Sequence, residues 1–317
     1  MIKYISYSGL NKMLFSPKLY YKHYILGEKE DSIDSWAIDG NLFDCYMTNE
    51  HEFFNRFSIV PGVIPSDNTK KLVYKIYKDF PVGSDDLSTY RTQILEELVN
   101  INLHQSLKTD EQRLEKILTP DAINYFKFLK SSENKIVVDN EQVIAAKTRA
   151  ELIKQDAKCS SKLALGGSDF NVEVVTQKMF YHELNGKYPF TLRGIPDRIV
   201  IDHKNKKIKI FDIKTTGKTL DDFYPDTYEY LKYDLQAAIY YTLVGNEYKN
   251  SDLKDYTVSF EFFVIDKYDQ YAFFEISHAA MQHNLKTLKE ALDIAHYHIS
   301  NNDYSVPYKF RNGSIII

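Results

Sequence analysis

Two aspartates and a lysine in the second half of the chain have the types and spacing of a small catalytic site. Asp212 and Lys214 end a run, residues 207–215, that alternates between apolar and polar residues from Ile208 onward. Residues two apart on a strand point to the same face, so the two charged side chains share one row. Asp197 begins the preceding run, which a turn over residues 203–206 joins to this strand as a hairpin. We therefore expect two carboxylates and one ammonium to lie close together.

This group of charges suits a divalent metal ion and a phosphate. Mg²⁺ prefers hard oxygen ligands and often takes only one or two carboxylates, which leaves places for water and phosphate oxygens. Asp197 and Asp212 would be ligands, and the carbonyl of Ile213 is a further candidate on geometric grounds. The ion would lower the pKa of a bound water, which Lys214 would orient or help to deprotonate. The expected chemistry is phosphodiester hydrolysis with Mg²⁺, for which Mn²⁺ could substitute.

A helix expected over about residues 228–244 follows the hairpin and carries Gln236 and Tyr240 four residues apart, on one face. Both side chains could line the same cleft as catalytic residues. Taken alone, this spacing more often means a buried tyrosine and a surface glutamine, and an isolated D-x-K is more often a solvated strand end. The combination within one hairpin and its following helix favours the functional interpretation.

The other elements must position this hairpin. Residues 1–165 are expected to be mainly helical, with one helix over residues 35–48 and a loop-rich insertion near residues 60–118, where Pro and Gly are frequent. Residues 166–300 are expected to form the sheet and its helices. A first hairpin spans 171–182 and 188–201 through Asn185-Gly186, strands follow over 256–265 and 270–276, and a helix covers 281–299. Residues 301–317 are a tail, and we expect the 317 residues to form one domain with additions.

Composition excludes several classes of protein. The 44% hydrophobic and 26% charged residues are typical of a globular chain, and no run approaches the roughly 20 apolar residues that span a bilayer. The two cysteines, Cys45 and Cys159, cannot ligate a four-cysteine iron–sulfur cluster, and the lack of a signal peptide or disulfide framework favours the cytoplasm. No H-E-x-x-H or phosphate-binding G-x-x-x-x-G-K-[ST] motif is present, so we expect neither zinc hydrolysis nor an ATP site.

A net charge of −4 means that nucleic-acid binding would need a local basic patch. The turn of the second hairpin supplies a candidate in Lys204, Lys206 and Lys207, whose side chains could contact DNA phosphates. A solvated hairpin tip is the more common explanation for such a cluster.

These residues resemble a known family. Gly194-Ile195-Pro196-Asp197, then Phe211 to Thr216 (FDIKTT), then Gln236-x-x-x-Tyr240 are similar to the motifs of the PD-(D/E)XK nucleases. The pattern is most similar to the RecB-like and exonuclease VIII-like branch, which includes phage recombination exonucleases. In that branch a segment similar to Tyr7-Ser8-Gly9-Leu10 precedes a helix that begins near a glycine, as at Gly40. The resemblance implies an α/β (α+β) fold with a restriction-endonuclease-like core, a central mixed β-sheet flanked by helices.

Two positions depart from the family pattern. Asp44 stands where this branch usually carries a metal-binding histidine, and an aspartate can still bind Mg²⁺. Relatives tend to have a glutamate about 20 residues before the Pro-Asp, and Gln177 has that spacing here. Glu173 and Glu183 are possible substitutes, and the sequence does not choose among the three.

The resemblance implies a metal-dependent DNA exonuclease that acts on double-stranded ends in phage-type recombination or repair. It also implies a single-strand annealing protein and further copies of the chain as possible partners, in the host cytoplasm if a phage encodes the protein. An endonuclease of the same superfamily is one alternative. The other is a catalytically weakened DNA-binding or assembly protein that keeps the fold, which the departures at Asp44 and Gln177 would explain.

Overall fold

The computed structural model describes residues 4–28, 35–166, 169–184 and 186–311, which form two compact units. The first unit joins Met1–Asn49 to Thr148–Ile317, and the second is Glu50–Lys147. The insertion expected near residues 60–118 therefore lies within the second unit.

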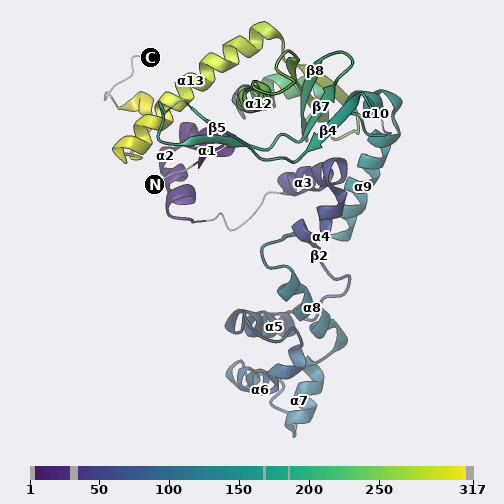
Figure 1. The fold of residues 1–317 in the computed structure, drawn as a ribbon. Coiled ribbons are helices and arrows are strands. Elements are labelled where there is room, and N and C mark those ends of the chain that lie inside the picture. Colours follow the sequence, from purple (N-terminus) through teal and green to yellow (C-terminus); the bar gives the residue numbers. More distant parts are fainter. Residues whose placement is uncertain (1–3, 29–34, 167–168, 185, 312–317) are drawn as a thin grey trace. The chain divides into compact units, whose positions relative to one another are not determined.

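The first unit is built on a five-stranded mixed sheet with the order β10-β9-β8-β7-β4 (Figure 1). Its strands are β4 (Val172–Thr176), β7 (Arg198–Asp202), β8 (Lys207–Thr215), β9 (Thr257–Ile265) and β10 (Tyr271–Glu275). β8 and β9 are parallel, and the other neighbours are antiparallel. The hairpin expected from residues 197 to 215 is thus present as β7 and β8.

The first expected hairpin is divided between two sheets. The parts of its two arms next to the turn are β5 (Phe180–Glu183) and β6 (Thr191–Gly194), which pair with each other. β6 also pairs with the short β1 (Tyr4–Ile5). Gln177 has φ +51° and separates β4 from β5, while Ile195-Pro196 separates β6 from β7. The left-handed residue and the proline end the regular pairing on both arms at the same level. Of the expected turn, Asn185 lies outside the described residues.

Helices cover both faces of the five-stranded sheet. Laterally paired residues share a face, so Arg198, Phe211 and Glu261 lie on one side and Asp212 on the other. Helix α12 (Tyr233–Tyr248) packs against β9, β5 and β6, and the long helix α13 (His278–Asn301) packs on α12. On the opposite face, Arg198 donates hydrogen bonds to carbonyls at the end of α10 (Ala157–Leu163). This arrangement confirms the expected class of a mixed sheet flanked by helices.

The remaining elements of the first unit are short helices and one that enters from the second unit. They are α1 (Tyr7–Phe15), α2 (Pro17–Tyr20), a π-helix (Tyr21–Ile25), α3 (Ser35–Thr48), α11 (Leu220–Asp222), a π-helix (Phe223–Tyr228) and a 3₁₀ turn (Tyr308–Phe310). α9 (Asn140–Gln155) passes from the second unit into the first. Ser6 and Ser16 cap α1 and α2 by accepting backbone N–H groups, which fixes where each helix begins.

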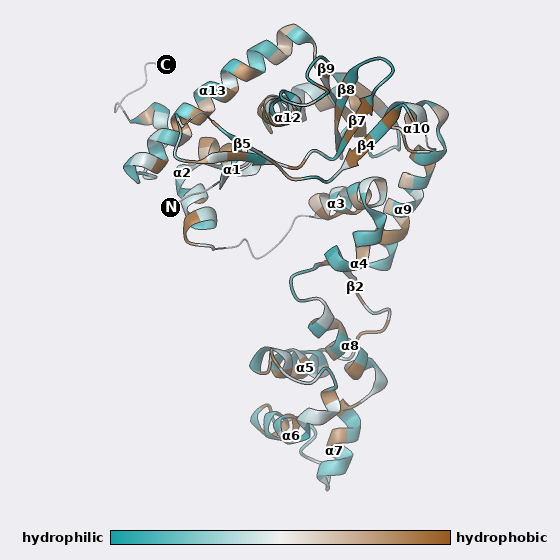
Figure 2. Cartoon of the chain, in the orientation of Figure 1, coloured by the Kyte–Doolittle hydropathy of each residue, from teal (hydrophilic) through white to brown (hydrophobic). Residues whose placement is uncertain are grey.

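The core of the first unit lies between the sheet and α12. Ile208 and Ile210 of β8 are fully buried there, beside Ala237 and Leu243 of α12. Figure 2 shows the hydrophobic colour concentrated on β7 and β4, whereas α13 alternates between hydrophilic and hydrophobic residues. The apolar half of the β8 row thus anchors the strand, and its charged half extends beyond this core.

The second unit is mainly helical and has its own core. Its elements are a 3₁₀ turn (Glu50–Glu52), α4 (Phe53–Arg56), β2 (Phe57–Ile59), α5 (Asp67–Asp79), a 3₁₀ turn (Leu87–Tyr90), α6 (Arg91–Asn100), α7 (Asp110–Ile117), α8 (Pro120–Ser131) and β3 (Ile136–Val138). β2 and β3 pair in parallel, with Phe57 opposite Ile136. The stretch expected to be rich in loops contains α5, α6 and α7, because the apolar spacing within Asp67–Asp79 forms a buried helical face between turn residues.

Across the described ranges, no helix combines the length and the apolar character needed to cross a membrane.

Candidate active site

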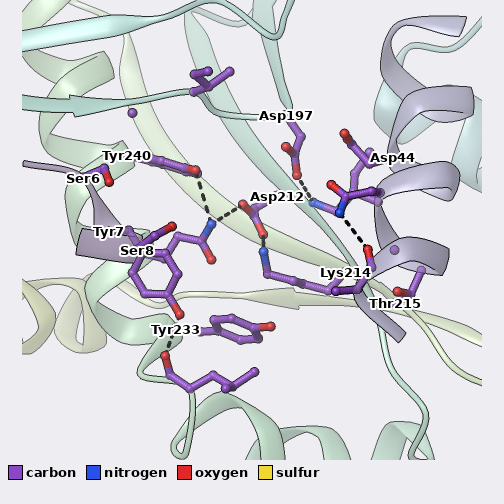
Figure 3. A pocket seen from close by; sticks show the side chains of 18 of the residues that line it. Ser6, Tyr7, Ser8, Asp44, Asp197, Asp212, Lys214, Thr215, Tyr233 and Tyr240 are labelled. Atoms are coloured by element: carbon purple, nitrogen blue, oxygen red, sulfur yellow. Dashed lines mark hydrogen bonds and ion pairs between the residues drawn. The ribbon is translucent and has the colours of Figure 1, made fainter. Parts of the chain in front are cut away.

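The β7–β8 hairpin brings two carboxylates and one ammonium to the same place (Figure 3). Asp212 and Lys214 lie on one face of β8 and form an ion pair, with Asp212 only 1% exposed. Asp197 directly precedes β7, and its Oδ2 accepts a hydrogen bond from the backbone N–H of Ile213 at 2.7 Å. The backbone of β8 therefore holds the carboxylate of the neighbouring strand.

Helix α12 contributes an amide and a phenol to the same site. Gln236 Nε2 donates a hydrogen bond to Asp212 Oδ1 at 2.9 Å and lies 3.3 Å from the Tyr240 hydroxyl. Gly194 allows this close packing, because a Cβ there would lie 2.7 Å from Cε1 of the Tyr240 ring. The surface position expected for an isolated glutamine is not observed, since Gln236 is buried.

Asp44 and Gln177 meet on the other side of Asp197. Gln177 Nε2 lies 3.3 Å and 3.4 Å from the two Asp44 carboxylate oxygens and 3.5 Å from Asp197 Oδ1. Thr48, one turn after Asp44 on α3, also contacts the Gln177 amide, at 3.3 Å. α3 can approach β8 because Gly40 has no side chain, and a Cβ there would lie 3.0 Å from Thr215 Oγ1. The two positions that depart from the family pattern are therefore neighbours in space.

The electrostatics of the site follow from burial and from like charges. Burial raises the pKa of Asp197 well above its usual range, and the carboxylates of Asp212 and Asp44 raise it further. Burial also raises the pKa of Asp212, while the ammonium of Lys214 opposes this rise. Burial disfavours the charge of Lys214, but the interactions with Asp212, Tyr233 and Asp197 together outweigh this effect, so the pKa of Lys214 is raised well above its usual range. Lys214 is thus held as an ammonium, and its Nζ lies 4.8 Å from the centre of the Tyr233 ring.

The donor set suits a divalent cation. Carboxylate oxygens are the ligands that Mg²⁺ and Mn²⁺ prefer, and a cation would relieve the repulsion that raises the pKa of Asp197. In the part of the chain that the structure describes, no three His, Cys, Asp or Glu side chains are close enough to form a metal site. Asp44, Asp197 and Asp212 are thus near neighbours without a closed ligand shell.

A cavity of about 700 Å³ opens over these residues, and its wall includes parts of the chain that the sequence-based site did not contain. Ser6 and Ser8 come from the start of α1, and Arg193 comes from β6. The Tyr7 hydroxyl donates a hydrogen bond to the Leu231 carbonyl at 2.6 Å, which ties α1 to the segment before α12. The similarity of residues 7–10 to the family's N-terminal segment was the sequence feature that could have placed α1 at the site. No sequence feature pointed to Arg193.

Two groups of sequence candidates lie away from this cavity. Glu173 is exposed at the other end of β4, where it lies 3.7 Å from His203, and Glu183 lies on β5 opposite Thr191. Gln177, rather than either glutamate, therefore contacts Asp44 and Asp197. The turn lysines 204, 206 and 207 are exposed at the end of β8 opposite to Asp212, roughly 16 Å along the strand at 3.3 Å per residue.

One of the comparisons with known proteins identifies a family for the chain. The family model described as the PD-(D/E)XK nuclease superfamily matches residues 4–301. No curated protein sequence matches the chain. A crystal structure of a protein from Eubacterium rectale, provisionally named an exonuclease, is similar at 14% identity with a TM-score of 0.48, over 99% of this chain and 90% of that one. The assignment rests on the family match, which covers both arms of the site: the chain belongs to the PD-(D/E)XK nuclease superfamily.

Proposed function

We propose that the protein is a metal-dependent deoxyribonuclease that hydrolyses phosphodiester bonds in the cavity around Asp197, Asp212 and Lys214. The observation that carries this proposal is the buried Asp212–Lys214 ion pair beside Asp197, within a chain of this nuclease superfamily. A buried ion pair adds little to stability compared with well-packed apolar residues. Its position at the floor of an open cavity instead supports a chemical role.

Each residue has a distinct proposed role. Asp197 and Asp212 would hold Mg²⁺ or Mn²⁺, with Asp44 and the carbonyl of Ile213 as further ligands. When bound, the metal ion lowers the pKa of a water that it holds and neutralises negative charge on the phosphate. Lys214, held as an ammonium, orients the attacking water and stabilises negative charge that develops on the phosphate.

The neighbouring side chains position these groups. Gln236 fixes the rotamer of Asp212 through its 2.9 Å hydrogen bond, and Tyr240 supports the amide of Gln236. Gln177 bridges Asp44 and Asp197, which holds two carboxylates near each other despite their repulsion. These contacts keep the three carboxylates as near neighbours, and binding of a cation would draw them closer together.

The biological setting that we propose is digestion of double-stranded DNA ends in phage-type recombination or repair. The support for this setting is the resemblance of the site motifs to the exonuclease VIII-like branch, which also suggests a single-strand annealing protein as a partner, self-assembly of the chain and a cytoplasmic location. DNA contact by Lys204, Lys206 and Lys207 stays a prediction, and it would occur well away from the cleaved bond.

The test is cleavage of end-labelled linear DNA and of closed circular DNA with Mg²⁺ or Mn²⁺. We expect loss of the linear substrate from its ends, and cutting of the circle would identify an endonuclease instead. Asp212→Asn and Lys214→Ala should abolish cleavage, whereas Lys289→Ala, at an exposed position of α13 away from the cavity, should retain it. Circular dichroism would check that each variant is folded. A wild-type protein without metal-stimulated cleavage of any DNA or RNA would refute the proposed function.

A further inference from the structure

A second cavity of about 590 Å³ adjoins the candidate active site. Both cavities are lined by Thr215, Leu231 and Tyr233, so they share one wall. Thr215 is the last residue of β8, and the second cavity continues along the loop that follows it, through Thr216, Gly217 and Lys218. The second cavity is therefore adjacent to the first, within reach of a ligand that extends past this shared wall.

The topology gathers basic side chains around this second cavity. Lys218 follows β8 and Lys267 follows β9, and because these strands are parallel, both loops leave the same edge of the sheet. Arg149 of α9 completes the group, and its Nε lies 2.6 Å from Asp269 in the turn between β9 and β10. That ion pair holds α9 against the turn that carries Lys267.

The charges of the two cavities differ in sign. Three carboxylates, those of Asp44, Asp197 and Asp212, line the first cavity and outnumber its two cationic side chains, those of Arg193 and Lys214. The second has one carboxylate, which belongs to Asp39, and three cationic side chains, of which Arg149 is paired with Asp269. A metal ion suits the first set, and a phosphate group suits the second, particularly beside the hydroxyl groups of Thr215 and Thr216.

An exposed tyrosine ring lies in the wall of the same cavity as these cations. Tyr230 lines the second cavity and is 76% exposed, which leaves most of its ring accessible to a planar group. Proteins that bind single strands combine positive charge along the backbone with aromatic side chains on which bases stack. A phosphate site beside an exposed tyrosine ring is therefore suited to one nucleotide of a strand.

We propose that the second cavity binds the nucleotide adjacent to the bond that is cleaved, with Lys218 and Lys267 at its phosphate and Tyr230 against its base. This inference rests on the proposed function, because it assumes that a nucleic-acid strand occupies the first cavity. It adds a binding subsite that lies beyond the catalytic residues.

The test measures binding of a fluorescent single-stranded oligodeoxynucleotide to the full chain in EDTA, which prevents metal-dependent hydrolysis. Lys218→Gln with Lys267→Gln should weaken binding and reduce the slope of log K against log salt by about 1.4, as expected for the loss of two phosphate contacts on a single strand. Tyr230→Ala should weaken binding roughly five- to hundredfold, and Tyr230→Phe should not.

The matched control is Lys286→Gln with Lys289→Gln, which removes two exposed lysines of α13 that line neither cavity. An unchanged affinity and salt slope in the Lys218/Lys267 variant, or equal losses in the control, would overturn the proposed subsite. So would a wild-type protein that does not bind the oligonucleotide. Cleavage is measured separately: lysine-dependent binding without cleavage refutes the nuclease reaction alone, and cleavage with unchanged binding refutes the subsite alone.

Discussion

Replacing Lys214 with methionine should destabilise the protein, because it leaves the carboxylate of Asp212 buried without its ammonium partner. Asp212 is 1% exposed and the Lys214 side chain is 17% exposed, so water cannot replace the lost partner well. Removing one member of a buried ion pair costs about 3–5 kcal/mol. For a folded unit of 150–250 residues, 3 kcal/mol corresponds to a decrease in Tm of roughly 6–12 °C.

A double-mutant cycle separates this effect from simple loss of packing. Asp212→Asn removes the buried negative charge, so Lys214→Met should cost much less in that background, with a coupling free energy of about 2 kcal/mol. Thermal and urea unfolding in EDTA would measure the four proteins. Lys207→Met, on the exposed end of the same strand, controls for the loss of a lysine and should change stability little. A coupling below about 0.5 kcal/mol would refute the buried ion pair as the basis of the site.

Three further predictions concern two more residues of the candidate site and an ion pair of the second unit. In EDTA at neutral pH, Asp197→Asn should raise the free energy of unfolding by about 1 kcal/mol. Because the pKa of Asp197 is raised in the folded protein, the higher stability of the variant should disappear in thermal unfolding as the pH falls towards the usual carboxyl range. Mg²⁺ should stabilise the wild type more than the variant. Gly194→Ala should cost about 1–3 kcal/mol and slow cleavage, since the added methyl group would displace the Tyr240 ring; unchanged unfolding and kcat would contradict this. The hydrogen bond from Lys75 lowers the pKa of Glu97 in the folded protein. Glu97→Gln should therefore lower the Tm at pH values above the usual glutamate pKa, and this difference should disappear as the pH falls through the folded pKa. A decrease in Tm that does not depend on pH would contradict the ion pair.

Local patterns predict the second hairpin well, because alternation along residues 208–214 directly encodes which side chains share a face. The same reasoning places Gln236 and Tyr240 on one face of a helix that begins five residues later than expected. The order of the strands in the sheet could not be predicted in this way, since it depends on pairing between distant segments that no local pattern encodes.

The first hairpin shows where local reasoning ends. The β-branched and aromatic residues of both arms predict two long strands, yet each arm is divided between two sheets at Gln177 and Pro196. Proline is a visible signal for such a break, but the left-handed conformation of a glutamine is not. Arg193 and Lys218 escape prediction for a related reason: their proximity to the site depends on tertiary packing rather than on sequence spacing.

The parallel pairing of β2 with β3 has a consequence for how the molecule can fold. About 100 residues separate the two segments of the first unit, and Asp44 precedes this interval whereas Asp197 follows it. Once Phe57 pairs with Ile136, the path between the two segments shortens to about 20 residues, which lowers the loop-closure cost by about 1.4 kcal/mol. Early formation of the second unit would thus favour the long-range contact between α3 and β8. Because β2 and β3 are parallel, a linker in place of residues 60–135 would need about a dozen residues or more to return to the start of β3.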